Sequence, residues 1–145
     1  MKKFIKIIIL SLLFLNNVNA EEREIELNNL FTQLNNSEIP EAIEIENKIW
    51  KIWSTHPSKD RKGYRLTDLL TQGSLMMAKE ELDGAYEIFS QIILVDPTWS
   101  EAWNKRATVL YLLGLYQQSQ KDIDVVLKLE KRHFGALSGQ GLVQT

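Results

Sequence analysis

Small and bulky residues recur along the C-terminal half of the chain at a fixed spacing of 34 residues. Small side chains return at Gly73, Ala107 and Gly141. Large apolar side chains return at the same spacing in the pairs Phe89 and Ile123, Ile92 and Val126, and Trp103 and Leu137. Such a period is typical of antiparallel helix pairs, because one pair cannot bury both apolar faces and stacks on the next. The pattern predicts an all-α solenoid with small residues at close helix crossings and bulky residues packed inside.

The first third of the chain also shows helical spacing. Apolar residues spaced for one helix face are followed by a polar turn and a second apolar stripe: Leu27, Leu30, Phe31 and Leu34, then Ile45, Ile49, Trp50 and Trp53. We expect Trp50 and Trp53 to pack in this hairpin rather than to form a ligand-stacking platform. Residues 54–65 are predicted to be a solvated loop, with His56 exposed in it.

Helix ends in the repeated region are marked by turn residues. Asp96-Pro97 predicts the end of one helix, since proline cannot continue the hydrogen-bond ladder. Thr98 and Glu101 have the spacing of a capping box for the next helix. Gly114 predicts a turn. Lys131 stands where a second proline is expected, so we predict that the helix before it runs on slightly.

The N-terminus has the three parts of a secretory signal peptide. Lys2, Lys3 and Lys6 precede an apolar core, and Val18-Asn19-Ala20 has the small-residue pattern of a cleavage site. The core is shorter than the about 20 residues that span a bilayer. We therefore expect a bacterial protein that is cut after Ala20, periplasmic or secreted, with no stable membrane insertion after cleavage. The expected parts are residues 1–20 (signal peptide), 21–62 (degenerate helical hairpin and loop) and 63–145 (repeat array).

Charge and composition argue against several functions. The chain has 17 basic and 19 acidic residues, and the signal removes three lysines and no acid, so the mature net charge is −5. An acidic protein is a poor candidate for nucleic-acid binding, which depends on phosphate neutralisation. With no cysteine there is no thiolate metal site or cysteine nucleophile. We expect no catalytic residue, cofactor or metal, because the chain has only His56 and His133, and the glycines near 135–141 follow a helix rather than a strand.

The segment from Leu66 to Thr145 resembles tetratricopeptide repeats, about two and a third of them. The matching features are the small residue of each first helix, the small residue that opens the second, the bulky residue four later and the closing Pro97. The runs DPTWSEAWNKRAT and RHFGALSG are similar to a secreted tetratricopeptide family of alphaproteobacteria whose members are mostly of unassigned function. With the N-terminal hairpin, the resemblance implies about three helical hairpins and a terminal capping helix.

The resemblance implies a non-enzymatic scaffold or adaptor that binds a protein or peptide segment in a concave groove. In this family the first helix of each pair lines the groove, and the corresponding positions are Thr67, Leu70, Ser74, Met77, Glu101, Asn104, Lys105, Thr108 and Tyr111. Ser138 and Leu142 extend this set. Asn104, Thr108 and Tyr111 share a helix face, and an asparagine amide can bond a peptide backbone as both donor and acceptor.

The third repeat contains only its first helix. We expect this lone helix to act as a terminal cap. Alternatively, the chain is a natural truncation with an exposed apolar face that invites a homodimer or another partner. The alternative function is a structural subunit of a cell-envelope assembly that associates through this terminal helix, at Leu142 and Val143.

Overall fold

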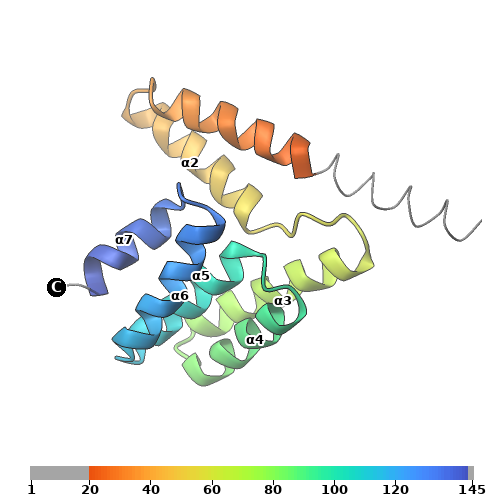
Figure 1. Ribbon diagram of the computed structural model, residues 1–145, viewed down its shortest axis with the longest axis vertical. Coiled ribbons are helices and arrows are strands. Elements are labelled where there is room, and N and C mark those ends of the chain that lie inside the picture. The colour runs from red at the N-terminus through yellow and green to blue at the C-terminus, as the bar shows by residue number, and fades with distance from the viewer. Residues whose placement is uncertain (1–19, 144–145) are drawn as a thin grey trace, which may run out of the picture. The chain divides into compact units, whose positions relative to one another are not determined.

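The computed structural model describes residues 20–143, and every regular element in this range is an α-helix, which confirms the all-α prediction. The helices are residues 20–34, α2 (Ile39–Trp53), α3 (Arg61–Ala78), α4 (Leu82–Val95), α5 (Ser100–Leu112), α6 (Tyr116–Leu129) and α7 (Phe134–Val143) (Figure 1). The predicted signal peptide lies outside the described residues, apart from Ala20. The chain divides into two compact units, Met1–Tyr64 and Arg65–Thr145.

The first unit contains the predicted hairpin of residues 20–34 and α2. Its buried apolar side chains come from both helices: Leu27, Leu30, Ile45, Ile49 and Trp53. The Trp53 ring lies 6.0 Å from that of Phe31 and 5.5 Å, edge-on, from that of Trp50. The core role predicted for Trp53 is confirmed, and the half-buried Trp50 packs against it.

The loop after α2 is shorter than predicted, because Asp60 starts α3 at Arg61. The Asp60 carboxylate accepts a 2.7 Å hydrogen bond from the Gly63 N–H, and this bond lowers the pKa of Asp60. A Cβ atom at Gly63 would lie 1.9 Å from the Ser58 carbonyl oxygen, so this turn requires glycine. The prediction of an exposed His56 is wrong. His56 is only 6% exposed, and its Nδ1 accepts a 3.1 Å hydrogen bond from the Ser58 N–H.

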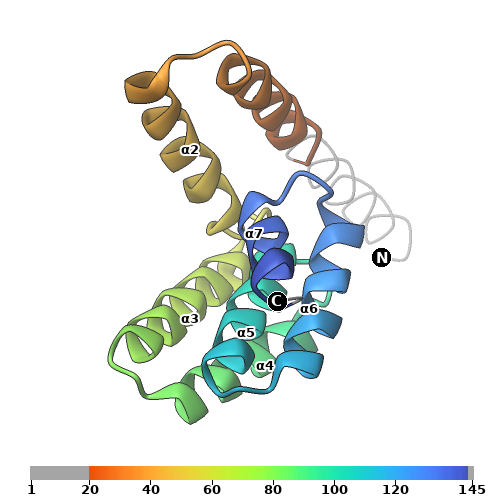
Figure 2. The same cartoon turned by 90° about the vertical axis from the view of Figure 1, so that its left-hand side faces the viewer.

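The second unit stacks its helices in chain order, so that α5 packs on α4 and α6, and α7 packs on α6 and α5 (Figure 2). One core cluster joins α3, α4 and α5: Leu66, Leu70, Ala85, Phe89, Ile92, Ile93, Trp99, Ala102 and Val109. A second cluster joins α5, α6 and α7: Ala107, Ile123, Val126 and Ala136. This arrangement is the predicted solenoid of helix pairs.

Close crossings occur at the small residues of the first and second repeats. A Cβ atom at Gly73 would lie 2.7 Å from Cε1 of Phe89, and Ala107 packs in one cluster with Ile123. The third repeat differs from the prediction. Leu137 is 48% exposed, and a Cβ atom at Gly141 would meet nothing within 4 Å. Both were expected inside, but the helices that cover this face in the first two repeats have no counterpart among residues 134–143.

Substituting alanine at Gly73 and at Gly141 is expected to have opposite effects. Alanine favours a helix by about 1 kcal/mol over glycine. At Gly73 the methyl group must displace the buried Phe89 ring, and overpacking of this kind costs about 1–3 kcal/mol. We therefore expect Gly73→Ala to lower the free energy of unfolding and Gly141→Ala to leave it equal or raise it, as measured by urea denaturation. Equal effects at the two sites would contradict the difference in packing.

The turns inside the two complete repeats use the same backbone geometry. The residue that leaves the first helix of each pair has a positive φ, 63° at Glu80 and 75° at Gly114. Glycine adopts this conformation without strain, whereas a residue with a Cβ atom pays about 1–2 kcal/mol. The predicted turn at Gly114 is confirmed, and Glu80 adopts it at the cost of local strain.

The ends of α4 and α6 are also equivalent, at Asp96 and Glu130. Both residues are extended, with φ of −143°, and both side-chain carboxylates accept the N–H two residues on, from Thr98 and Arg132, at 2.9 Å. The prediction that α6 runs on past its repeat boundary is wrong. Glu130 ends the helix without a proline, because its carboxylate holds the following turn.

The predicted capping box before α5 is also wrong. The Thr98 hydroxyl donates to the Asp96 carboxylate at 2.6 Å, and the residue at the N-cap position is Trp99, whose side chain makes no capping hydrogen bond. Glu101 is buried and bonds elsewhere. The spacing of Thr98 and Glu101 is therefore coincidental, because the Thr98 hydroxyl bonds to Asp96 and the Glu101 carboxylate bonds to other side chains.

Acid is expected to weaken the turn at Glu130. Burial raises the pKa of this carboxyl, but hydrogen bonds from the Arg132 guanidinium and backbone outweigh burial, so its pKa lies below the ordinary 4.5. A group with a lowered folded pKa stabilises the protein above its unfolded pKa, and loses that contribution as pH falls through the folded value. We expect Glu130→Gln to lose less stability than the unaltered protein between about pH 5 and pH 3 in urea denaturation. Parallel pH profiles would contradict this contribution.

Candidate functional site

A hollow of about 160 Å³ opens between α5, α6 and α7 in the second unit. It is lined by Asn104, Ala107, Thr108, Tyr111, Ser119, Ile123, Gly135, Ser138, Gly139, Leu142 and Val143. None of these residues carries a carboxylate, an imidazole, an ammonium or a guanidinium group. The lining is therefore neutral, with apolar walls and a few hydroxyl and amide groups.

The structure brings three of the predicted groove residues together in this hollow. Asn104, Thr108 and Tyr111 line it from α5, as their common helix face predicts. Ser138 and Leu142, predicted to extend the groove, line it from α7. The Tyr111 ring packs at 5.4 Å from the ring of Tyr116, which supports this wall of the hollow.

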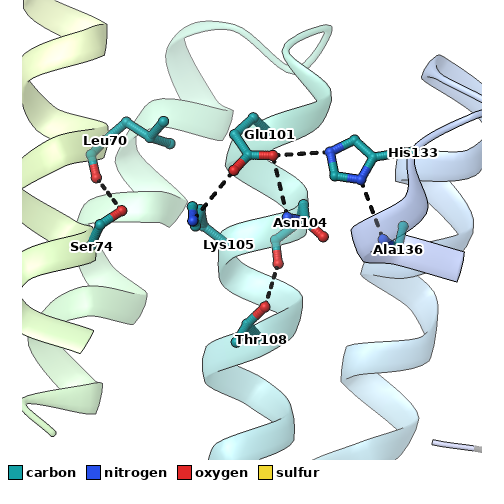
Figure 3. A network of polar contacts seen from close by, with 8 residues as sticks. All are labelled: Leu70, Ser74, Glu101, Asn104, Lys105, Thr108, His133 and Ala136. Atoms are coloured by element: carbon teal, nitrogen blue, oxygen red, sulfur yellow. Dashed lines mark hydrogen bonds and ion pairs between the residues drawn. The ribbon is translucent and has the colours of Figure 1, made fainter. Parts of the chain in front are cut away.

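The predicted groove residues of α3 do not line the hollow. Thr67, Ser74 and Met77 are half-buried on α3, and the Ser74 hydroxyl donates to the Leu70 carbonyl at 2.8 Å (Figure 3). Leu70 belongs to the core cluster. Its side chain therefore contributes to packing and is not presented at the surface.

Glu101, predicted as a groove residue, is fully buried, and no part of its side chain reaches the surface. Its Oε2 lies 3.0 Å from Nε2 of His133 and 3.2 Å from the amide nitrogen of Asn104, and its Oε1 lies 3.4 Å from Nζ of Lys105 (Figure 3). Lys105, also a predicted groove residue, is half-buried beside it. The buried Glu101 thus links α5 to His133, the residue just before α7.

Six lining residues were not among the predicted groove positions: Ala107, Ser119, Ile123, Gly135, Gly139 and Val143. The 34-residue spacing had placed Ala107 at a close helix crossing and Ile123 among the packed bulky residues. The Ser119 hydroxyl donates to the Ala107 carbonyl at 2.8 Å. A Cβ atom at Gly139 would lie 3.3 Å from Cδ1 of Ile123. Small residues on α7 therefore let it approach α6 closely. From the sequence, a phosphate-binding loop was excluded for these glycines, and no packing of α7 on α6 was predicted for Gly135 and Gly139.

A second hollow, of about 500 Å³, lies in the first unit between the helix of residues 20–34, α2 and the loop after it. Its lining mixes both charges: Glu22, Arg23, Glu26, Lys48, Lys51, Ile52, Thr55, His56, Pro57 and Lys59. The Arg23 guanidinium donates to the Thr55 carbonyl at 2.9 Å, which joins the two helices of the hairpin.

Residues 20–143 contain no group of three or more histidine, aspartate or glutamate side chains placed to hold a metal ion. Within the same range, no helix has both the length and the apolar character that crossing a bilayer requires.

The fold defines the class of protein: a helical-repeat solenoid with a 34-residue period. No protein-family model matches the chain. The chain is similar to a TPR repeat-containing protein of Rhizobium etli, with 34% identity over 119 residues, which are 81% of this chain and 55% of the relative. It therefore spans about half the length of that relative. Together these observations confirm the resemblance of the chain to tetratricopeptide (TPR) repeats.

The relative is named for its repeat and not for an activity. The narrower likeness to a secreted alphaproteobacterial group stays a prediction.

Proposed function

We propose that the chain is a non-catalytic adaptor that binds an extended segment of a partner protein in the hollow between α5, α6 and α7. The observation that carries this proposal is the convergence of Asn104, Thr108 and Tyr111 with Ser138 and Leu142 around one open hollow. A cavity of about 150 Å³ with apolar walls accommodates a benzene-sized group, so the hollow suits one apolar side chain of the partner. Its neutral lining favours an uncharged side chain, because an unpaired charge is costly to desolvate.

The same lining argues against catalysis at the hollow. General acid–base chemistry uses a carboxylate, an imidazole, an amine or a phenol within reach of the reacting group, and of these the lining offers only the phenol of Tyr111. The buried Glu101 and His133 are sealed from solvent, since neither side chain has any exposed surface. We therefore propose that the chain is not an enzyme and that it uses the hollow only for binding.

The experiment that tests this function first selects a binding peptide and then fills the hollow with a tryptophan side chain. A display library of random dodecapeptides is panned on the mature protein, and the enriched peptide is titrated by fluorescence polarisation. Ser138→Trp fills the hollow, whereas Leu137→Trp places the same side chain on the neighbouring residue, outside the lining. We expect Ser138→Trp to weaken binding by about tenfold or more, equivalent to about 1.4 kcal/mol, and Leu137→Trp to change it little. Equal affinities for the two variants would contradict binding in the hollow.

A second candidate function has an observation of its own. Leu137 and Leu142 are exposed, and the space beside Gly141 is open, so α7 presents an apolar face in the described part of the chain. A structural subunit of a cell-envelope assembly, or a homodimer, would bury this face. On that alternative, Leu137→Asp changes the oligomeric state in sedimentation analysis and Ser138→Trp does not affect it.

We also propose that the protein is exported to the periplasm by residues 1–20. The support is the lysine-rich start, the short apolar core and the Val18-Asn19-Ala20 cleavage pattern. Intact-mass analysis of protein expressed with its own N-terminus in a Gram-negative bacterium is expected to find a periplasmic product that begins at Glu21. A cytosolic product that retains Met1 would contradict export.

A further inference from the structure

We propose that Glu101 and His133 are positioning residues that hold the Asn104 amide with its oxygen toward the hollow. The bound segment must then supply a hydrogen-bond donor, and an internal backbone N–H of an extended peptide meets this requirement. This inference rests on the proposed function, because it specifies which kind of segment the hollow accepts. It also narrows the sequence-based expectation that Asn104 bonds a backbone as both donor and acceptor.

The direction of hydrogen bonding is set at the first turn of α7. The Ala136 N–H donates to Nδ1 of His133 at 3.3 Å. A backbone N–H can only donate, so Nδ1 must hold a lone pair and the ring hydrogen is on Nε2. His133 Nε2–H therefore donates to Oε2 of Glu101 across 3.0 Å. One backbone group thus determines the tautomer of a buried side chain.

The same reasoning sets the orientation of Asn104. The oxygen and nitrogen of an asparagine amide are assigned from the donors and acceptors that surround them. Here Oε2 of Glu101 accepts at 3.2 Å, so the group that faces it must be the amide nitrogen of Asn104. The amide oxygen is then directed away from Glu101, and Figure 3 draws it on the side of α7.

Burial makes this orientation rigid. Glu101 and His133 have no exposed side-chain surface, and Asn104 is 7% exposed. Turning the Asn104 amide would set its oxygen against a carboxylate oxygen in a site that water does not reach. An unpaired polar contact of this kind is costly in a low-dielectric interior.

Two hydroxyl groups of the lining also present acceptors, whereas those of Tyr111 and Ser138 can donate or accept. The Thr108 hydroxyl hydrogen is used on the Asn104 carbonyl at 3.0 Å, and the Ser119 hydroxyl hydrogen is used on the Ala107 carbonyl at 2.8 Å. Each hydroxyl oxygen retains lone pairs but no free hydrogen. The lining also has no cationic group to pair with a C-terminal carboxylate, so it favours an internal segment with its backbone N–H groups.

The arrangement itself is tested by NMR without any ligand. We expect long-range ¹H–¹⁵N correlations of the mature protein to show His133 as the Nε2–H tautomer, with its Nδ1 as the acceptor. Glu101→Gln removes the acceptor-only partner, so the Asn104 amide proton resonances are expected to broaden or shift, while Lys105→Gln changes them little. A Nδ1–H tautomer, or unchanged Asn104 amide signals in Glu101→Gln, would overturn the positioning role.

The consequence for binding is tested with the dodecapeptide selected by panning. Each backbone amide of this peptide is methylated in turn, and the affinity is measured for the unaltered protein and for Asn104→Ala. We expect methylation at one position to weaken binding to the unaltered protein by about tenfold, the value of one hydrogen bond, and to have little effect on Asn104→Ala. Amidation of the peptide C-terminus is expected to leave the affinity unchanged.

The outcomes separate the two proposals. Suppose that peptides are enriched and that Ser138→Trp weakens their binding, but that every methylation has the same effect on the unaltered protein and on Asn104→Ala. The donor requirement is then wrong and the proposed function stands. If affinity depends on a free C-terminal carboxylate of the peptide, the inference that the hollow binds an internal segment is wrong. If panning enriches no peptide, both the proposed function and this inference are contradicted.

Discussion

Replacing Phe89 with alanine is expected to lower the free energy of unfolding by about 3–5 kcal/mol. Phe89 is completely buried in α4, and its ring touches the face of α3 at Gly73. Removing the ring leaves a cavity that the surrounding helices can fill only in part. A natural domain has a total stability of about 5–15 kcal/mol, so this one change removes a large share of it. Urea denaturation followed by circular dichroism measures the loss.

The matched control for this prediction lies on the same helix. Leu94 is 84% exposed, and Leu94→Ala is expected to change stability by no more than about 0.5 kcal/mol. If Phe89→Ala costs as little as Leu94→Ala, α4 does not pack on α3 as described, and the stacking of helix pairs would have to be revised.

Replacing Arg106 with leucine is expected to cost about 3 kcal/mol, because it leaves a buried aspartate without its partner. The guanidinium donates two hydrogen bonds to Asp122, at 2.7 and 2.9 Å, and one to the hydroxyl of Ser90 at 3.2 Å. It also lies 4.9 Å above the ring of Trp103. Arg106 therefore joins α5 to both α4 and α6. The hydrogen bonds to Asp122 raise the pKa of Arg106, so it stays charged in any accessible buffer.

A double-mutant cycle separates the pair from its surroundings. Replacing a buried ion pair by apolar residues is often neutral, whereas removing one partner is strongly destabilising. We therefore expect Arg106→Leu with Asp122→Leu to lose much less stability than the two single changes added together. If the losses in free energy of unfolding are additive in urea denaturation, Arg106 and Asp122 contribute independently to stability, and this result would contradict the bidentate contact.

The 34-residue spacing correctly predicted a small residue at a close helix crossing and a buried bulky residue in the first complete repeat. Gly73 and Phe89 meet because the first and second helices of one repeat cross at these positions. The spacing failed at Leu137 and Gly141, because a periodic pattern assigns a buried face to α7 whether or not a second helix covers it. Periodicity predicts where a helix can be covered, and the covering element has to be found separately.

The polar part of the site was less predictable. Asn104, Thr108 and Tyr111 were expected on one face of α5, since only helical spacing is needed for that inference. The burial of Glu101 could not be predicted from its sequence neighbours, because its partner His133 lies 32 residues away, just before α7. Glutamate in the first turn of a helix usually faces solvent, and only the stacking of α7 on α5 turns this one into a buried acceptor.

The end of α6 is another feature that was predicted wrongly from the sequence. A missing proline at Lys131 suggested a longer helix, but the carboxylate of Glu130 stops α6 as that of Asp96 stops α4. Two different side chains reach the same hydrogen bond, to the N–H two residues on. A sequence comparison that looks for proline misses this equivalence, whereas one that looks for an acceptor finds it.

The most direct test of the central claim is a ¹H–¹⁵N NMR titration of the mature protein with the selected dodecapeptide. We expect the shift changes to concentrate on lining residues of α5, α6 and α7, in particular Thr108, Ser138 and Leu142, and to vanish in Ser138→Trp. Shift changes confined to residues 20–64, or to the exposed surfaces of α4 and α6, would contradict binding in the hollow.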